Sequence, residues 1–301
     1  MITLEHVTRR FGRVTAIDDL SLSVNKGEIF GIVGPDGAGK TTLLRMIIGV
    51  LEPTAGKITL LGSDRAEEVK ERIGYVPQRF SLYGDLTVME NIAVMGALYG
   101  ANKEQVAERG RSLLAFTNLL PFADRLADNL SGGMKQKLSL AAGLMHQPEV
   151  FFLDEPTTGV DPVSRREFWQ TLYRLNKDGM TVVVSTPYMD EAELCNTVAC
   201  LDEGRLVACG SPAALKAAYP YHVLELTTDA KALKNLLAPC PIIDINPFGD
   251  VYHIVAADAA ETSSAIRSRL AAAGITGYEL RNIAPQLEDV FVQLAKGGDS
   301  A

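Results

Sequence analysis

A glycine-rich motif in this chain suits the binding of a polyphosphate. It follows a short apolar run at 29–33 and consists of Gly34, Pro35, Asp36, Gly37, Ala38, Gly39, Lys40, Thr41 and Thr42. The glycines let backbone N–H groups approach phosphate oxygens without a Cβ in the way. Lys40 supplies a positive charge, and Thr41 supplies a hydroxyl for magnesium. A glycine-rich turn can match by chance, but the order of strand, loop and helix favours phosphate binding.

Two acids follow a second apolar run, in FFLDEP at 151–156. Ligands bind at the carboxyl ends of strands in α/β sheets. We therefore expect Asp154 to hold magnesium, directly or through water, and Glu155 to be the base that polarises an attacking water. A surface acid pair at a turn would give the same pattern, and Pro156 suits a turn. The phosphate loop elsewhere in the chain favours the site.

A third motif, LSGGMKQ at 130–136, predicts a second phosphate-binding element. Ser131 suits a helix cap, and Gly132 and Gly133 open that helix with bare backbone. The free N–H groups and partial positive charge of a helix N-terminus bind phosphate. The chain thus has two such elements where a simple ATPase needs one.

The segments that must position these motifs alternate between strand and helix patterns. Short apolar runs typical of buried parallel strands occupy 29–33, 150–154 and 181–185. The pattern between 87 and 120 is helical. We expect an α/β core with an inserted helical lobe.

The composition fits a globular protein with one larger and one smaller domain, since 47% of the 301 residues are hydrophobic. The net charge of −8 argues against nucleic acid as a partner. No apolar run reaches the roughly 18 residues that span a bilayer, so we expect no direct membrane insertion. The four cysteines lack metal-ligand spacing and fit a reducing cytoplasm.

A change of pattern near 210–221 predicts a domain boundary after residue 218. Beyond it we expect strand, helix, strand, strand, helix, strand and a last helix. This order suggests a small α+β, ferredoxin-like domain over 219–296. The last residues, 297–301, are expected to be a disordered tail.

The three motifs resemble those of the ATP-binding subunits of ABC transporters, over about residues 1–218. The resemblance implies a P-loop ATPase core with an antiparallel β-subdomain and a helical lobe, using ATP and Mg²⁺. It also implies a head-to-tail dimer of such domains, with each ATP between one P-loop and the other domain's LSGGQ-type helix. Ser131, Gly132 and Gly133 would then contact the partner's ATP, which explains the second phosphate-binding element.

Further roles follow from the resemblance at single positions. Phe11 stands where an aromatic ring stacks on adenine, although such a ring can also belong to a core. Gln78 matches a glutamine that senses magnesium and begins a loop docking onto the membrane subunit. Asp161, in GVDP, matches an acid at the dimer interface, although Asp-Pro also starts turns. Candidate docking or core residues after Gln78 are Phe80, Leu82 and Tyr83.

The chain departs from the family pattern at Pro187, in STPYMDEAE, where a histidine usually contacts the γ-phosphate. Proline has neither a side-chain donor nor a backbone N–H. Losing one donor to developing charge typically costs about 10²–10³ in rate. Asp36 also replaces a common asparagine. We therefore expect the site on this chain's own P-loop to hydrolyse ATP slowly and to bind it normally.

The expected function is that of an ATPase subunit driving export through a separate permease on the inner face of the cell membrane. The ending PQLEDVFVQLA at 285–295 resembles the last helix of the accessory domain in ABC-2-type exporters, which favours a permease of that type. A largely non-hydrolysing subunit paired with an active sister ATPase is the alternative, so both a homodimer and a heterodimer stay open. Nothing in the sequence favours a soluble ABC protein acting on ribosomes or DNA.

Overall fold

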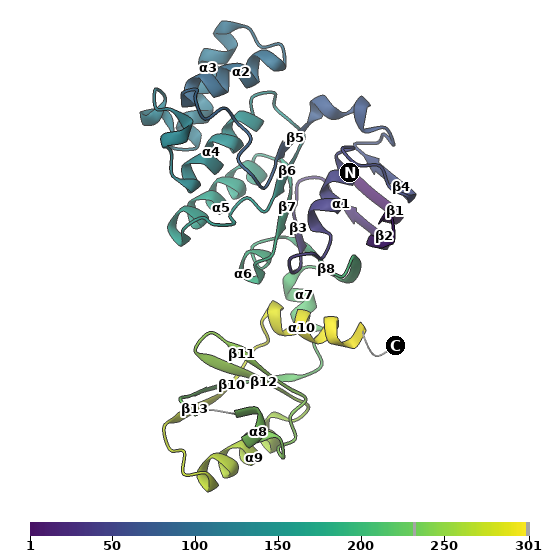
Figure 1. Cartoon of the computed structure of the whole chain (residues 1–301), viewed down its shortest axis with the longest axis vertical. Coiled ribbons are helices and arrows are strands. Elements are labelled where there is room, and N and C mark those ends of the chain that lie inside the picture. Colours follow the sequence, from purple (N-terminus) through teal and green to yellow (C-terminus); the bar gives the residue numbers. More distant parts are fainter. Residues whose placement is uncertain (231–232, 299–301) are drawn as a thin grey trace. The chain divides into compact units, whose positions relative to one another are not determined.

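The structure, a computed structural model, describes residues 1–230 and 233–298 and divides the chain into two compact units (Figure 1). The first unit is Met1–Pro212 and the second is Ala213–Ala301. Helix α7, Pro212–Ala217, begins at this division. The boundary predicted after residue 218 lies just beyond the other end of α7.

A six-stranded sheet forms the centre of the first unit. Its spatial order is β5 (Ile73–Val76), β6 (Val150–Asp154), β7 (Thr181–Thr186), β3 (Ile29–Val33), β8 (Thr197–Asp202) and β9 (Arg205–Gly210). All neighbouring strands are parallel except β8 and β9, which pair antiparallel. The strands β3, β6 and β7 are buried along their whole length, as their apolar sequences predict. Parallel pairing brings their carboxyl ends to one edge.

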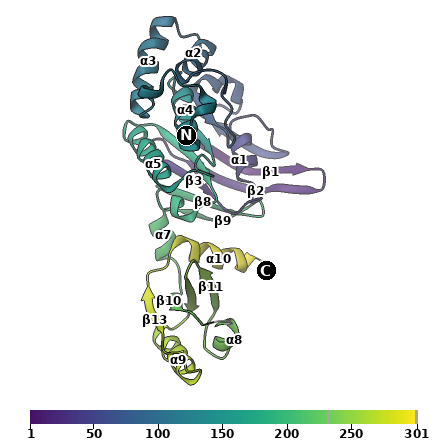
Figure 2. The ribbon, with the colours of Figure 1, turned by 60° about the vertical axis from the view of Figure 1, so that its left-hand side comes forward.

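A second, antiparallel sheet contains β2 (Val14–Val24), β1 (Ile2–Phe11) and β4 (Ala55–Leu60), in that order. Helix α1, Lys40–Ile47, lies between the two sheets and contacts both (Figure 2). Its buried Leu43, Leu44 and Ile47 join one hydrophobic core with Phe30 and Phe152. Burying both sheets against α1 fixes the phosphate loop that immediately precedes this helix.

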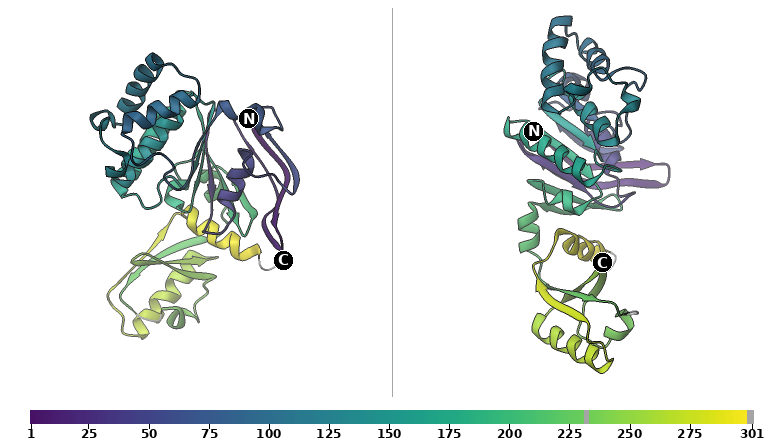
Figure 3. Two further views of the ribbon diagram at one scale, coloured as in Figure 1. Left: turned by 45° about the horizontal axis from the view of Figure 1, so that its top comes forward. Right: turned by 90° about the vertical axis from the view of Figure 1, so that its left-hand side faces the viewer.

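A helical lobe occupies the segment between β5 and β6 (Figure 3). It contains α2 (Val88–Leu98), α3 (Lys103–Phe116) and α4 (Gly132–Gly143). Thr87 and Asn102 begin α2 and α3 with capping boxes, in which side chain and backbone satisfy each other's hydrogen bonds. Short 3₁₀ turns lie at Ala66–Glu68, Lys70–Arg72, Leu120–Phe122 and Ala127–Asn129.

Helix α5, Pro162–Lys177, packs on the face of the sheet opposite α1 (Figure 1). It contacts both β7 and the helix α4 of the lobe. The short helix α6, Met189–Ala192, follows β7 and contacts β7 and β3. The six-stranded sheet is thus covered on both sides, as a parallel sheet requires.

The second unit is an antiparallel sheet covered by helices. The sheet has the order β11 (Asp244–Phe248), β12 (Val251–Ala256), β10 (His222–Thr228) and β13 (Tyr278–Ile283). Helices α8 (Leu233–Leu237) and α9 (Ala259–Ala272) lie on one face, and α10 (Leu287–Gly298) lies on the other (Figures 1 and 2). Of the predicted tail, 297 and 298 end α10, and 299–301 lie outside the described residues.

Packing of α4 against α5 gives a first test of the fold. A Cβ built on Gly133 would lie 2.6 Å from the Cβ of Ser164, whereas one on Gly132 would meet only the Gly159 carbonyl at 3.9 Å. We expect Gly133→Ala to destabilise the first unit by about 1–3 kcal/mol, because overpacking forces the helices apart. Gly132→Ala is the matched control and should leave stability unchanged or slightly raised.

Urea denaturation of the nucleotide-free protein measures both variants. Equal midpoints for Gly133→Ala and the wild type would contradict the described contact between the two helices.

Candidate functional site

The phosphate loop joins β3 to α1 and depends on two glycines. Gly39 has φ +96°, and a Cβ there would lie 2.5 Å from the carbonyl oxygen of Ala16. A Cβ on Gly34 would lie 2.2 Å from the carbonyl oxygen of Leu201. Only glycine fits at these close approaches of backbone to backbone. Gly37 is also left-handed, at φ +86°, but faces open space.

The other loop residues differ in exposure. Pro35 and Asp36 are exposed, Ala38 is buried, and Thr41 and Thr42 are half-buried in the first turn of α1. The side chain of Asp36, which replaces the common asparagine, therefore lies in solvent.

Lys40 is 4% exposed and its ammonium group is fully engaged. Its Nζ donates to the carbonyl oxygens of Gly34 at 2.8 Å and Pro35 at 2.9 Å. It also forms an ion pair with Glu155 Oε1 at 3.1 Å. A buried ammonium needs such partners, because burial without them is very costly. The predicted phosphate-binding lysine and the predicted base are therefore in direct contact.

Asp154 is fully buried at the end of β6 and accepts several hydrogen bonds. The hydroxyls of Thr41 and Ser185 donate to its Oδ1 at 2.9 and 2.8 Å. The Tyr75 hydroxyl lies 3.4 Å from Oδ2. Burial, followed by the charge of Asp154, raises the pKa of Tyr75, so this phenol stays protonated as a donor.

Glu155 is a buried acid in an unusual backbone conformation. Its φ of +47° is left-handed, a conformation that costs a non-glycine residue about 1–3 kcal/mol. Its backbone N–H donates to the carbonyl and the hydroxyl oxygen of Ser185, at 3.1 and 3.0 Å. Gln78 Nε2 donates to its Oε2 at 2.8 Å. The carboxylate thus joins Lys40 on one oxygen and Gln78 on the other.

Magnesium fits the groups that converge here. Mg²⁺ takes oxygen ligands and usually binds one or two carboxylates together with substrate phosphates and water. The Thr41 hydroxyl and the Asp154 carboxylate meet at 2.9 Å beside the phosphate loop and offer such oxygens. Gln78 contacts Glu155 and can supply an amide oxygen from the end of β5. These are the three metal ligands predicted from the sequence.

The LSGGMKQ motif opens α4 with Ser131 as the N-cap, and its side chain accepts from the Met134 N–H at 3.4 Å. Ser131 and Gly132 are exposed, whereas Gly133 is buried against α5. Within the described parts of the chain, no hydrogen bond or ion pair joins these three residues to the phosphate loop. The first residues of α4, Ser131 and Gly132, are therefore exposed to solvent and are not bonded to the phosphate loop.

Asp161 caps α5 and accepts from the backbone N–H groups of Val163 and Ser164, at 3.1 and 3.0 Å. The bonds from Ser164 are the main cause that holds the pKa of Asp161 below its usual value. The turn expected from the Asp-Pro pair is thus present, and its carboxylate is exposed. The same Ser164 packs on Gly133, so Asp161 and the LSGGMKQ motif are neighbours.

Phe11 ends β1 with 46% of its surface exposed, so its ring does not belong to the core. The Arg9 guanidinium lies 4.5 Å from the ring centroid and covers one face. Of the candidate docking residues, Phe80 and Leu82 pack partly buried against the core of the helical lobe. Tyr83 is 54% exposed.

Pro187 directly follows β7 and is half-buried. The next backbone donor, the Tyr188 N–H, already donates to the Thr186 hydroxyl oxygen at 3.1 Å. Residues 187 and 188 therefore offer no free backbone N–H at the end of this strand.

Sequence reasoning missed several contributors to this site, namely Tyr75, Ser185, Thr157, Thr158 and Thr186. Each lies on or just after the carboxyl end of a buried parallel strand. The Thr158 hydroxyl, for example, donates to Glu155 Oε2 at 3.4 Å. Hydroxyl residues at the ends of apolar runs are the signal that could have found most of them.

Comparisons with known proteins agree with this geometry. The family model described as ABC transporter matches residues 17–158. The Nod factor export ATP-binding protein I of Ralstonia nicotianae is 36% identical over 300 residues, covering 98% of this chain and 93% of the relative. The chain therefore belongs to the ABC transporter family, as an ATP-binding protein.

Further relatives include the probable multidrug ABC transporter ATP-binding protein YbhF of Escherichia coli, 39% identical over 310 residues. The chain spans about half of that relative's length, 53%. The linearmycin resistance ATP-binding protein LnrL of Bacillus subtilis is 38% identical over 216 residues, which is 70% of this chain and 69% of LnrL.

Among solved structures, a dimeric post-hydrolysis state of the ATP-binding cassette MJ0796 bound to ADP and Pi superposes with a TM-score of 0.65. It is 28% identical and covers 70% of this chain and 98% of its own. The cbiO1 protein of Clostridium perfringens gives 0.67 at 25% identity, covering 72% of this chain and 90% of its own. The P-loop ABC ATPase fold of the first unit is thus established. Over the residues the structure describes, no helix has both the length and the apolar character to cross a bilayer.

The ion pair between Lys40 and Glu155 predicts competition with nucleotide. Phosphate groups must draw the Lys40 ammonium away from a carboxylate that also repels them. Glu155→Gln should therefore tighten ADP binding by roughly threefold to tenfold, about 1 kcal/mol. ADP is the ligand of choice because hydrolysis cannot affect the result, and isothermal calorimetry gives its Kd.

Glu149→Gln is the matched control, since Glu149 pairs with Arg72 just before the other end of β6. Its Kd should equal that of the wild type. Weaker ADP binding by Glu155→Gln would contradict the competition.

Proposed function

We propose that this chain hydrolyses MgATP as the ATPase subunit of an ABC exporter. The observation that carries the proposal is the convergence of Lys40, Thr41, Asp154 and Glu155 at one edge of the parallel sheet. Glycine backbone, a buried ammonium and a hydroxyl–carboxylate pair are the groups that a phosphoryl transfer site requires. The direction of transport is supported by the name of one relative, a Nod factor export ATP-binding protein, and a multidrug ABC transporter ATP-binding protein is a further relative.

In the proposed reaction, the backbone N–H groups of residues 34–42 hold the phosphates of ATP. The Lys40 ammonium transfers its contact from Glu155 to the phosphates, which frees the carboxylate. Thr41, Asp154 and Gln78 would hold magnesium, which would neutralise charge on the phosphates when bound. Glu155 then accepts a proton from, or orients, the water that attacks the γ-phosphate, and ADP leaves as the bond between the γ-phosphorus and the bridging oxygen breaks. Phe11 stacks on the adenine through the ring face that Arg9 leaves open.

A second domain completes each site in this proposal. Ser131, Gly132 and Gly133 of one domain would bind the ATP held by the other, with Asp161 beside them at the interface. Support comes from the exposed N-terminus of α4, which makes no described contact with its own phosphate loop. The second domain is another copy of this chain or a sister ATPase.

Turnover at this chain's own P-loop is proposed to be slow. Pro187 offers no donor, and the Tyr188 N–H is committed to Thr186. Neither Pro187 nor the backbone N–H of Tyr188 is therefore available to stabilise charge that develops on the γ-phosphate. The alternative, a largely non-hydrolysing subunit that pairs with an active sister ATPase, rests on the same observation.

The partner that carries the cargo is proposed to be a separate membrane permease of the ABC-2 type, with this chain bound to it on the inner face of the membrane. Of the candidate docking residues, Tyr83 is exposed and does not pack in the core of the helical lobe. No nucleic acid partner is proposed. The strand order β11-β12-β10-β13 with the chain order βαββαβ supports a ferredoxin-like assignment for the second unit, as a structural or regulatory domain.

Single-residue changes at positions 155 and 187 test the reaction in the purified protein. We expect slow turnover in the wild type and none in Glu155→Gln. Pro187→His should raise kcat at least about tenfold, because it restores a donor to the γ-phosphate. Pro187→Ala is the control, since it changes the backbone but adds no side-chain donor.

A phosphate-release assay at saturating MgATP measures all four proteins. Turnover that survives Glu155→Gln would contradict the role of the base. A fast wild type that Pro187→His does not change would contradict the proposed defect.

A further inference from the structure

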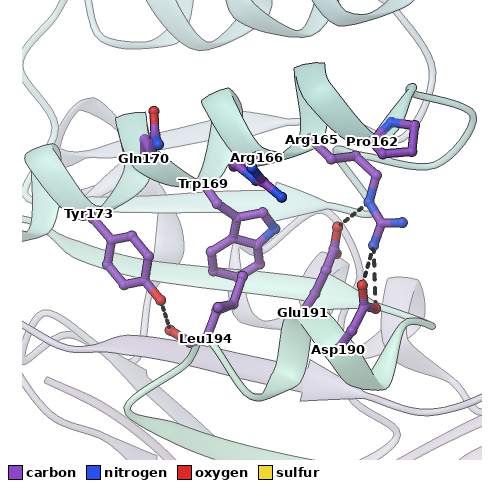
Figure 4. A pocket seen from close by; sticks show the side chains of 9 residues that line it. All are labelled: Pro162, Arg165, Arg166, Trp169, Gln170, Tyr173, Asp190, Glu191 and Leu194. Atoms are coloured by element: carbon purple, nitrogen blue, oxygen red, sulfur yellow. Dashed lines mark hydrogen bonds and ion pairs between the residues drawn. The ribbon is translucent and has the colours of Figure 1, made fainter.

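The buried carboxylate of Glu191 has no role in the proposed reaction, but it contacts three segments of the candidate site. Glu191, in α6, is 2% exposed, and both of its oxygens are used. The Thr157 hydroxyl and Arg165 Nε donate to Oε1 at 2.6 and 3.0 Å. The Thr186 hydroxyl donates to Oε2 at 2.6 Å. Figure 4 shows Glu191 between α5 and α6, facing Arg165.

Each partner of Glu191 lies close in sequence to a candidate site residue. Thr157 follows the base Glu155 by two positions, and Thr186 directly precedes Pro187. Arg165 stands in the first turns of α5, whose N-cap is Asp161. The Glu191 carboxylate therefore connects three segments. These are the segment that follows the base Glu155, the end of β7 next to Pro187, and helix α5, which begins at Asp161.

The hydrogen bonds define the geometry of these segments closely. A charged acceptor makes bonds about twice as strong as neutral ones, and a buried carboxylate without partners would be very costly. Thr186 uses its hydroxyl twice, since it donates to Glu191 and accepts from the Tyr188 N–H. The bond to Glu191 thus also orients the turn that contains Pro187. A shift of either strand end would break a bond to the same buried charge.

A neighbouring acid provides an internal comparison. Asp190 also binds Arg165, through the Nη2 atom at 3.2 Å, but its side chain is 75% exposed. Figure 4 shows the two acids side by side on α6, with the dashed lines from each acid ending on the Arg165 guanidinium. Asp190 has no described bond to the strand ends, and an exposed ion pair contributes little. The two acids therefore share a cation and differ in their link to the site.

We propose that Glu191 is a positioning residue that couples the segment of Glu155 to the end of β7, so that both respond together when nucleotide binds. The inference rests on the proposed ATPase function. Glu191 touches neither nucleotide nor water in this scheme, and it acts through Thr157 and Thr186. In a site without the usual histidine, the correct placement of Glu155 then depends on this carboxylate.

The test compares Glu191→Gln with Asp190→Asn in the full-length protein. Glu191→Gln should lower kcat by roughly 10- to 100-fold, since small misplacement of reacting groups has effects of this size. Its Kd for ADP should stay within about twofold of the wild type, because the phosphate loop is untouched. Asp190→Asn should leave both kcat and Kd unchanged. Equal effects of the two substitutions would overturn the proposal.

A second pair of variants separates positioning from folding. Thr157→Val removes one hydroxyl without burying a lone charge, and Thr157→Ser retains the hydroxyl. We expect Val to lower kcat about tenfold at unchanged Kd, and Ser to restore most of the loss. If Ser and Val reduce kcat equally, packing rather than the bond to Glu191 is responsible, and the proposal fails.

Hydrogen exchange tests the coupling even where turnover is very slow. In the wild type, adding MgATP should protect peptides covering 155–160 and 186–190 together. In Glu191→Gln, protection of 186–190 should be lost while 34–42 stays protected. Identical exchange in both proteins would overturn the proposal. A wild type in which MgATP protects none of these segments would instead contradict the ATP-binding function itself.

Discussion

The structure of the site depends on the buried positive charge of the Lys40 ammonium. A site for polyphosphate needs this charge, and other groups of the chain must neutralise it where no phosphate does. Lys40 is 4% exposed, and such an ammonium cannot stay buried without acceptors. Two loop carbonyls and Glu155 provide them. The Lys40 ammonium, which is expected to bind phosphate, therefore holds the carboxylate of the base Glu155. Three features support the ion pair between Lys40 and Glu155. They are the edge of the sheet where the strands end, the left-handed backbone of Glu155, and the close backbone packing at the glycines of the phosphate loop.

Buried carboxylates that accept several hydrogen bonds also link the ends of the strands. Asp154 accepts from Thr41 and Ser185, so α1, β6 and β7 meet at one carboxylate. Glu191 repeats the arrangement nearby with Thr157, Thr186 and Arg165. In both cases, a buried acid whose charge needs several donors determines how the loops of a parallel sheet align. By contrast, Ser131 and Gly132 are exposed, and the described hydrogen bonds of the Ser131 side chain stay within its own helix cap, which fits a ligand supplied by a second domain.

The sequence predicted well those features that local pattern determines. Apolar runs located β3, β6 and β7, and the motifs placed Lys40, Thr41, Asp154 and Glu155 in one site because parallel strands end at one edge. Contacts between distant segments could not be predicted in this way. The Gly133 approach to Ser164 depends on how α4 and α5 cross, and the Glu191 bonds depend on where α6 returns to the sheet. Pro187 was visible as a departure, but the loss of the Tyr188 N–H to Thr186 was not.

In the proposed dimer, the two phosphate-binding elements of one chain bind different nucleotides. The most direct measurement mixes two defective variants, Lys40→Met and Ser131→Arg, and follows dimerisation with MgATP by analytical ultracentrifugation. We expect that neither variant dimerises alone. The mixture should dimerise with one ATP per dimer, because one P-loop and the opposite helix N-terminus are then intact. A mixture that stays monomeric although the wild type dimerises with MgATP, or a Lys40→Met protein that dimerises by itself, would contradict this division of roles.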